Sequence, residues 1–77
     1  MPSRSIEFYT DAFEWAHGKR PSGRGSWAFS FYRNGSLYRS PEGETTFFAP
    51  PGLYSEAKRW ARAKAREIGA TDIAVQS

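Results

Sequence analysis

A run of alternating aromatic residues constrains the fold of this chain more than any other feature. Three large aromatic residues occupy every second position of one short segment: Trp27, Phe29 and Phe31. A period of two is typical of a strand with one buried face. The chain has 77 residues and no cysteine, so no disulfide can stabilise it, but its 3 Trp, 4 Tyr and 6 Phe can fill a small core. We expect a single domain over residues 1–77, with Trp15, Trp27, Phe29 and Phe31 in that core.

A tight-turn dipeptide follows the aromatic run. Asn34-Gly35 tolerates positive φ at both positions and is the strongest short signal for a two-residue hairpin loop. A loop of this length pairs Tyr32 with Leu37 and Phe31 with Tyr38. The sequence therefore predicts that Tyr38 shares the buried face of the aromatic strand.

Two further segments carry strand and turn signals. Residues 40–44, Ser-Pro-Glu-Gly-Glu, have Pro and Gly placed as turns need them. Residues 45–49 are rich in β-branched and aromatic residues and predict another strand. The Pro-Pro-Gly sequence at 50–52 ends that strand, because proline cannot donate a ladder hydrogen bond.

The C-terminal half predicts one helix and a short last strand. We expect Ser55 to cap the helix at its start and Gly69 to end it. Apolar residues recur between them at helical spacing: Ala57, Trp60, Ala61, Ala65 and Ile68. This single apolar stripe should pack on the sheet, with Trp60 against it. Residues 71–76 then predict a strand at a sheet edge.

The first 17 residues carry a mixed signal. Ile6 and Phe8 are in phase as a strand, and so are Phe13 and Trp15, but the phase slips between the two pairs. A bulge near Thr10-Asp11 would reconcile them as one long strand, which we favour. A short helix is the competing interpretation. The predicted fold is α+β, an antiparallel β-meander of three to four strands packed by one helix in the C-terminal half.

Positive charge is segregated along the chain. The net charge is only +3, but no acidic residue occurs between Trp15 and Pro41. That segment holds five cationic side chains: Lys19, Arg20, Arg24, Arg33 and Arg39. The predicted helix adds a second set at four-residue spacing: Lys58, Arg62 and Arg66. Segregation of this kind indicates an anionic partner, with a merely solvated surface as the alternative.

A basic, glycine-rich loop precedes the aromatic strand. Residues 17–25 read His-Gly-Lys-Arg-Pro-Ser-Gly-Arg-Gly, so glycines allow close approach while three cations supply charge. No helix follows, so a helix-capped nucleotide fingerprint is excluded. Aromatic residues beside cationic grooves are typical of proteins that bind single-stranded nucleic acid. Tyr9, Tyr32 and Tyr54 are the better candidates for exposed stacking, because the tryptophans and phenylalanines are needed for the core.

The same loop carries a resemblance. The pattern His-Gly-Lys-x-Pro-x-Gly-x-Gly-x-Trp over residues 17–27, with Tyr-Ser-Glu-Ala-Lys at 54–58, resembles a group of small uncharacterised proteins of bacteria, phages and mobile elements. This resemblance would cover most of the chain. It implies a source of that kind but brings no established activity.

These observations favour a non-enzymatic nucleic-acid-binding module of a phage, mobile element or bacterium. The predicted contacts to DNA or RNA phosphates come from the eight cations above: Lys19, Arg20, Arg24, Arg33, Arg39, Lys58, Arg62 and Arg66. Such contacts position a protein but do not read bases. The alternative is a small protein-binding effector, such as a phage inhibitor of a host defence complex, which presents the same cations to an acidic protein surface.

Other classes of function find little support in the sequence. His17 is the single histidine, and no motif places a nucleophile beside it. One histidine without cysteine is a poor metal site, so we expect no catalytic residues, no metal and no cofactor. No apolar stretch has the length of a signal peptide or a membrane span. We therefore expect a cytoplasmic protein that does not enter membranes.

Overall fold

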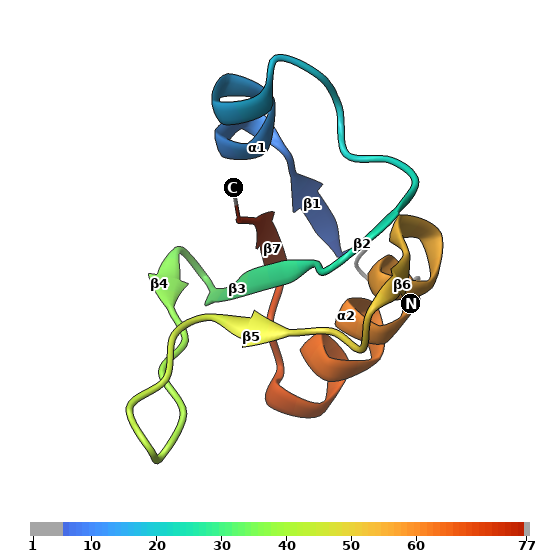
Figure 1. Ribbon diagram of the computed structural model, residues 1–77. Helices are drawn as coiled ribbons and strands as arrows, with labels where there is room; N and C mark the ends of the chain where they lie inside the picture. Colours follow the sequence, from blue (N-terminus) through green and yellow to red (C-terminus); the bar gives the residue numbers. More distant parts are fainter. Residues whose placement is uncertain (1–5, 77) are drawn as a thin grey trace, which may run out of the picture.

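The computed structural model describes residues 6–76 of the chain. The elements follow one another in this order: β1 (Glu7–Tyr9), α1 (Asp11–His17), β2 (Arg24–Gly25), β3 (Ala28–Arg33), β4 (Ser36–Leu37), β5 (Phe47–Phe48), β6 (Gly52–Leu53), α2 (Tyr54–Ile68) and β7 (Asp72–Val75). The fold is α+β with a mostly antiparallel sheet and a helix in the C-terminal half, as predicted (Figure 1).

The main sheet has the strand order β1-β7-β3-β4, and β5 also pairs with β3. β4 pairs with the end of β3 at Tyr32–Arg33, whereas β5 pairs with its start at Ala28–Phe29. β4 and β5 therefore act as two halves of one interrupted neighbour of β3. The short strands β2 and β6 form a separate antiparallel pair.

The predicted hairpin is confirmed. Tyr32 pairs with Leu37, and the Tyr38 amide donates to the Phe31 carbonyl at 2.7 Å. Asn34 and Gly35 both have positive φ, at 52° and 83°. The turn thus has the backbone geometry for which Asn-Gly is suited.

The last strand lies inside the sheet, and the prediction of an edge position is wrong. β7 pairs in parallel with β1 on one side and antiparallel with β3 on the other. Ile73 and Val75 have no exposed surface. Because no local sequence pattern specifies which strands are neighbours across the fold, alternation alone did not reveal this position.

Residues 6–17 form a short strand and a helix, so the prediction of one long bulged strand is wrong. β1 ends at Tyr9 and α1 begins at Asp11. Gly18 ends α1 with φ 69°, and its amide donates to the Glu14 carbonyl at 2.7 Å. The slip in the sequence pattern marks this change of element. Phe13 is buried on the inner side of α1, whereas Trp15 is 92% exposed, which corrects its predicted place in the core.

The helix α2 follows its predicted stripe. Ala57, Ala61 and Ala65 are buried, and Trp60 and Ile68 pack partly buried against the core. Gly69 ends the helix with φ 74°, as expected. Ser55 is not the cap, because the helix begins one residue earlier. The Glu56 carboxylate instead accepts a hydrogen bond from the Leu53 amide at 3.2 Å.

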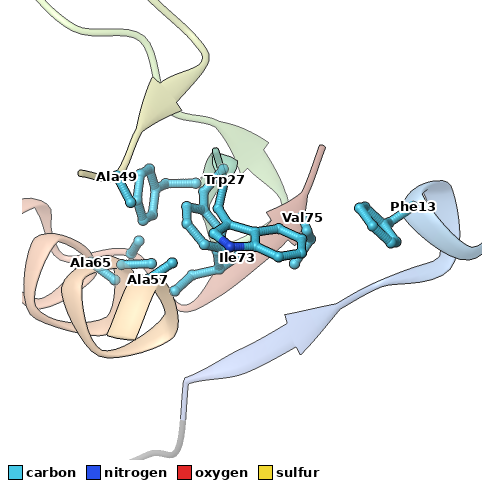
Figure 2. Packing of buried hydrophobic residues seen from close by; sticks show 11 residues of the cluster. Phe13, Trp27, Ala49, Ala57, Ala65, Ile73 and Val75 are labelled. Carbon is cyan, nitrogen blue, oxygen red and sulfur yellow. The ribbon is translucent and has the colours of Figure 1, made fainter. Parts of the chain in front are cut away.

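The core lies between α2 and one face of the sheet. Phe29 and Phe31 of β3 are fully buried on this face beside Ile73 and Val75 of β7. Trp27 lies within the same cluster, with Phe13 reaching it from α1 (Figure 2). The Trp27 indole N–H donates to the Gly52 carbonyl at 3.2 Å, so its one polar atom is satisfied inside the core.

Candidate nucleic-acid interface

The basic loop presents its cations to solvent. Lys19, Arg20 and Arg24 are all exposed, as predicted. The chain here arches from α1 to β2 and arrives beside β6 (Figure 1). Long charged side chains on such a connection are free to meet a ligand without first breaking core contacts.

The second half of this loop is anchored. Pro21 is buried, and the Gly23 carbonyl accepts a hydrogen bond from the Tyr54 amide at 2.8 Å. Gly23 has φ 79°, a conformation that favours glycine. Arg24 and Gly25 then pair with β6. These contacts fix the basic loop to the start of α2, although the two segments lie far apart in the sequence.

This anchoring brings the two predicted basic regions together. Arg20 of the loop and Lys58 of α2 line one pocket of about 330 Å³. Phe8, Thr10 and Tyr54 form other parts of its wall. None of the described residues that line the pocket carries a carboxylate. The pocket has the size of a small-ligand site and a cationic wall from two separate elements.

Two of the helix cations, Lys58 and Arg62, pack over an aromatic ring. The Lys58 ammonium lies 5.2 Å from the centre of the Phe8 ring, and the Arg62 guanidinium carbon lies 5.1 Å from it. Both side chains are half-buried, whereas Arg66, one turn further on, is exposed. The ring fixes two positive charges near the pocket, which lowers the entropy that a bound anion would have to remove. We call Arg20, Lys58 and Arg62 the loop–helix cluster.

The pKa of Tyr54 responds to the positive charge of the cluster. Burial raises the pKa of its phenol above the ordinary value, and the positive charge of Arg20 offsets part of that rise. The phenol therefore stays neutral near pH 7. A neutral phenol can donate a hydrogen bond to an anionic oxygen in the same pocket.

Lys19 and Arg24 do not line this pocket. They lie instead along a second groove of about 400 Å³, together with His17. The His17 ring stacks on Phe13 with 4.2 Å between the ring centres. The basic loop thus divides its cations between two hollows of the surface.

Arg33 and Arg39 belong to a separate place. They flank the β3–β4 hairpin, which lies at the opposite end of β3 from the basic loop (Figure 1). The Arg39 guanidinium donates to the Gly43 carbonyl at 3.2 Å and so supports the turn at 40–44. The eight predicted cations therefore do not form one continuous surface.

Sequence reasoning missed the aromatic part of the site. Phe8 was read only as a strand residue, and its role under two helix cations depends on the pairing of β1 with β7. Of the three tyrosines expected to be available for stacking, Tyr9 is 50% exposed. Tyr32 and Tyr54 are half-buried. The exposed phenylalanine, Phe48 at 71%, was assigned no role.

Residues 6–76 contain no group of three or more His, Cys, Asp or Glu side chains that could hold a metal ion. Within the same residues, no helix is both long and apolar enough to cross a membrane.

Comparison with known proteins adds no relative. No family model, no curated protein and no solved structure matches the chain.

Proposed function

We propose that this protein is a non-enzymatic nucleic-acid-binding module whose loop–helix cluster contacts backbone phosphates. The observation that carries the proposal is the pocket in which Arg20 and Lys58 meet. Like charges held close together disfavour each other, and an anion bound between them removes that repulsion. A polyanion can contact several such cations at once, which favours nucleic acid over a single small anion.

The two arginines of the cluster suit phosphate contacts. Arg20 extends from a loop and Arg62 from a helix. Each planar guanidinium group can donate two parallel hydrogen bonds to two oxygens of one phosphate. Phosphate contacts position the ligand without reading its sequence, so we expect weak sequence preference. A bacterial, phage or mobile-element source and a cytoplasmic location remain predictions.

Salt dependence tests the proposal. Each phosphate contact should contribute about −0.9 to the slope of log K against log salt on duplex DNA and about −0.7 on a single strand. Replacing Arg20 and Lys58 together by Gln should therefore make the slope less steep by the contribution of about two phosphate contacts. Fluorescence anisotropy of a labelled oligonucleotide, titrated at several salt concentrations, measures both quantities.

A charge-matched variant is the control. Arg33→Gln with Arg39→Gln removes the same two charges from the remote hairpin and tests whether those residues contact the ligand at all. If the hairpin variant flattens the slope as much as the cluster variant, the loop–helix cluster is not the principal site. Absence of any binding at low salt would reject a nucleic-acid function.

A specific observation supports the alternative of a protein-binding effector. Trp15 is 92% exposed on α1, and tryptophan is enriched at the centres of protein interfaces. Capture of a protein from nuclease-treated lysate that is lost on Trp15→Ala would favour this alternative over nucleic-acid binding.

A further inference from the structure

The sheet has one face that α2 does not cover. Neighbouring residues of a strand point to opposite faces. The Phe29 ring lies 6.3 Å from that of Trp60 on α2, so Phe29 and Phe31 point toward α2. Ala28, Ser30 and Tyr32 therefore point the other way. Phe48 pairs with Ala28 and shares this second face. Its partner in sequence, Phe47, packs on the α2 side, where its ring lies 5.5 Å from that of Phe31.

Phe48 is a large apolar ring left in solvent. It is 71% exposed, although its strand pairs with β3, whose Phe29 and Phe31 are fully buried. An exposed ring gains little for folding and offers a flat surface to a partner. The ring borders the second groove, the hollow of about 400 Å³ described above.

Cations from the basic loop line the same groove as Phe48. Lys19 and Arg24 are exposed there, and none of the groove-lining residues in the described chain is acidic. Ser22 and Gln76 add polar groups. One groove thus combines an exposed aromatic ring with two positive charges.

The opposite end of the same face has the reverse charge. Glu7 and Asp72 pair with each other across β1 and β7, and Asp72 also pairs with Tyr32. The Tyr9 hydroxyl donates to the Asp72 carboxylate at 3.5 Å. Carboxylates repel phosphates, so only the end that carries Phe48 suits a nucleic-acid backbone.

We infer that the groove between Phe48 and the basic loop binds an unpaired nucleotide, with its base stacked on Phe48 and its phosphates held by Lys19 and Arg24. This inference rests on the proposed function and names its substrate class, a single strand. A base inside a duplex has both faces stacked on its neighbours and offers none to Phe48, whereas a single strand can turn a base into the groove.

Phe48→Ala tests the inference. The variant should lose single-strand affinity by about 5- to 100-fold, because stacking of one base on one aromatic ring contributes about that factor. Duplex affinity should stay within about twofold. The salt slope should not change, because no charge is removed. The fold should be unaffected, since the ring is mostly in solvent.

Trp15→Ala is the matched control. It removes a larger exposed aromatic side chain from α1 that does not line the groove. Labelled single strands of DNA and RNA and the matching duplex serve as probes for all three proteins. Equal effects of Phe48→Ala and Trp15→Ala, or equal losses on single strand and duplex, would overturn the stacking site. If salt-dependent binding persists in that case, the proposed function stands without it, whereas no binding to any probe overturns both.

Discussion

The three tryptophans show how differently one residue type can be used. Trp27 is 6% exposed, and its ring lies 4.8 Å from that of Tyr54 and 5.6 Å from that of Phe13. It joins the start of α2 to α1 through the core. Trp60 is half-buried and tilted against Phe29, as the stripe of α2 predicted. Trp15 touches solvent almost everywhere.

Trp27→Phe should destabilise the protein by about 1–3 kcal/mol, because the buried Gly52 carbonyl loses its donor. Phenylalanine keeps most of the apolar surface, so the loss of stability comes from the missing hydrogen bond together with the smaller ring. Trp15→Phe, at an exposed site, should stay within about 0.5 kcal/mol. Urea unfolding followed by circular dichroism gives both values. Equal stability of Trp27→Phe and the parent protein would mean that the indole bond adds nothing.

At the scale of elements, the sequence predicted the features that depend on interactions between residues close together in the chain. The Asn34-Gly35 turn, the alanine stripe of α2 and its end at Gly69 were all predicted, because turn conformation and helix periodicity depend on near neighbours. The helix within residues 10–17 was not predicted, because a bulged strand and a change from strand to helix give the same apolar pattern over so short a stretch. The cap at Gly18 was the available signal for α1.

That cap makes a testable prediction. Gly18→Ala should lower the free energy of unfolding by about 1 kcal/mol, because φ 69° is unfavourable for a residue with a Cβ atom. The lower conformational entropy of alanine in the unfolded chain offsets only part of this cost. No atom lies within 4 Å of the added Cβ, so the cost is one of backbone conformation and not of a clash. Gly18→Asn should cost less, since asparagine tolerates this conformation better. Chemical denaturation of the three proteins gives the order. If Ala and Asn are equivalent, α1 does not depend on this cap.

At the scale of the whole molecule, long-range pairing decides the site. The cations of the loop–helix cluster were identified from sequence, but their meeting depends on the contact between Gly23 and Tyr54. The same is true of Phe8, which reaches Lys58 only because β1 pairs with β7. Charge and residue type are visible in a sequence, whereas proximity across the fold is not. The separation of Arg33 and Arg39 from the cluster was missed for the same reason.

The central position of β7 gives the last prediction, which compares one substitution at two places. Ile73 is fully buried in β7, with neighbours in β1 and β3, whereas Ile68 is half-buried at the end of α2. Ile73→Ala should cost about 2–5 kcal/mol, because the sheet around it is paired on both sides and cannot collapse into the cavity. This is a large part of the total stability of so small a domain. Ile68→Ala should cost less than half as much, since its site already meets solvent. Equal costs in thermal and urea unfolding would place β7 at the periphery, where the sequence pattern first put it.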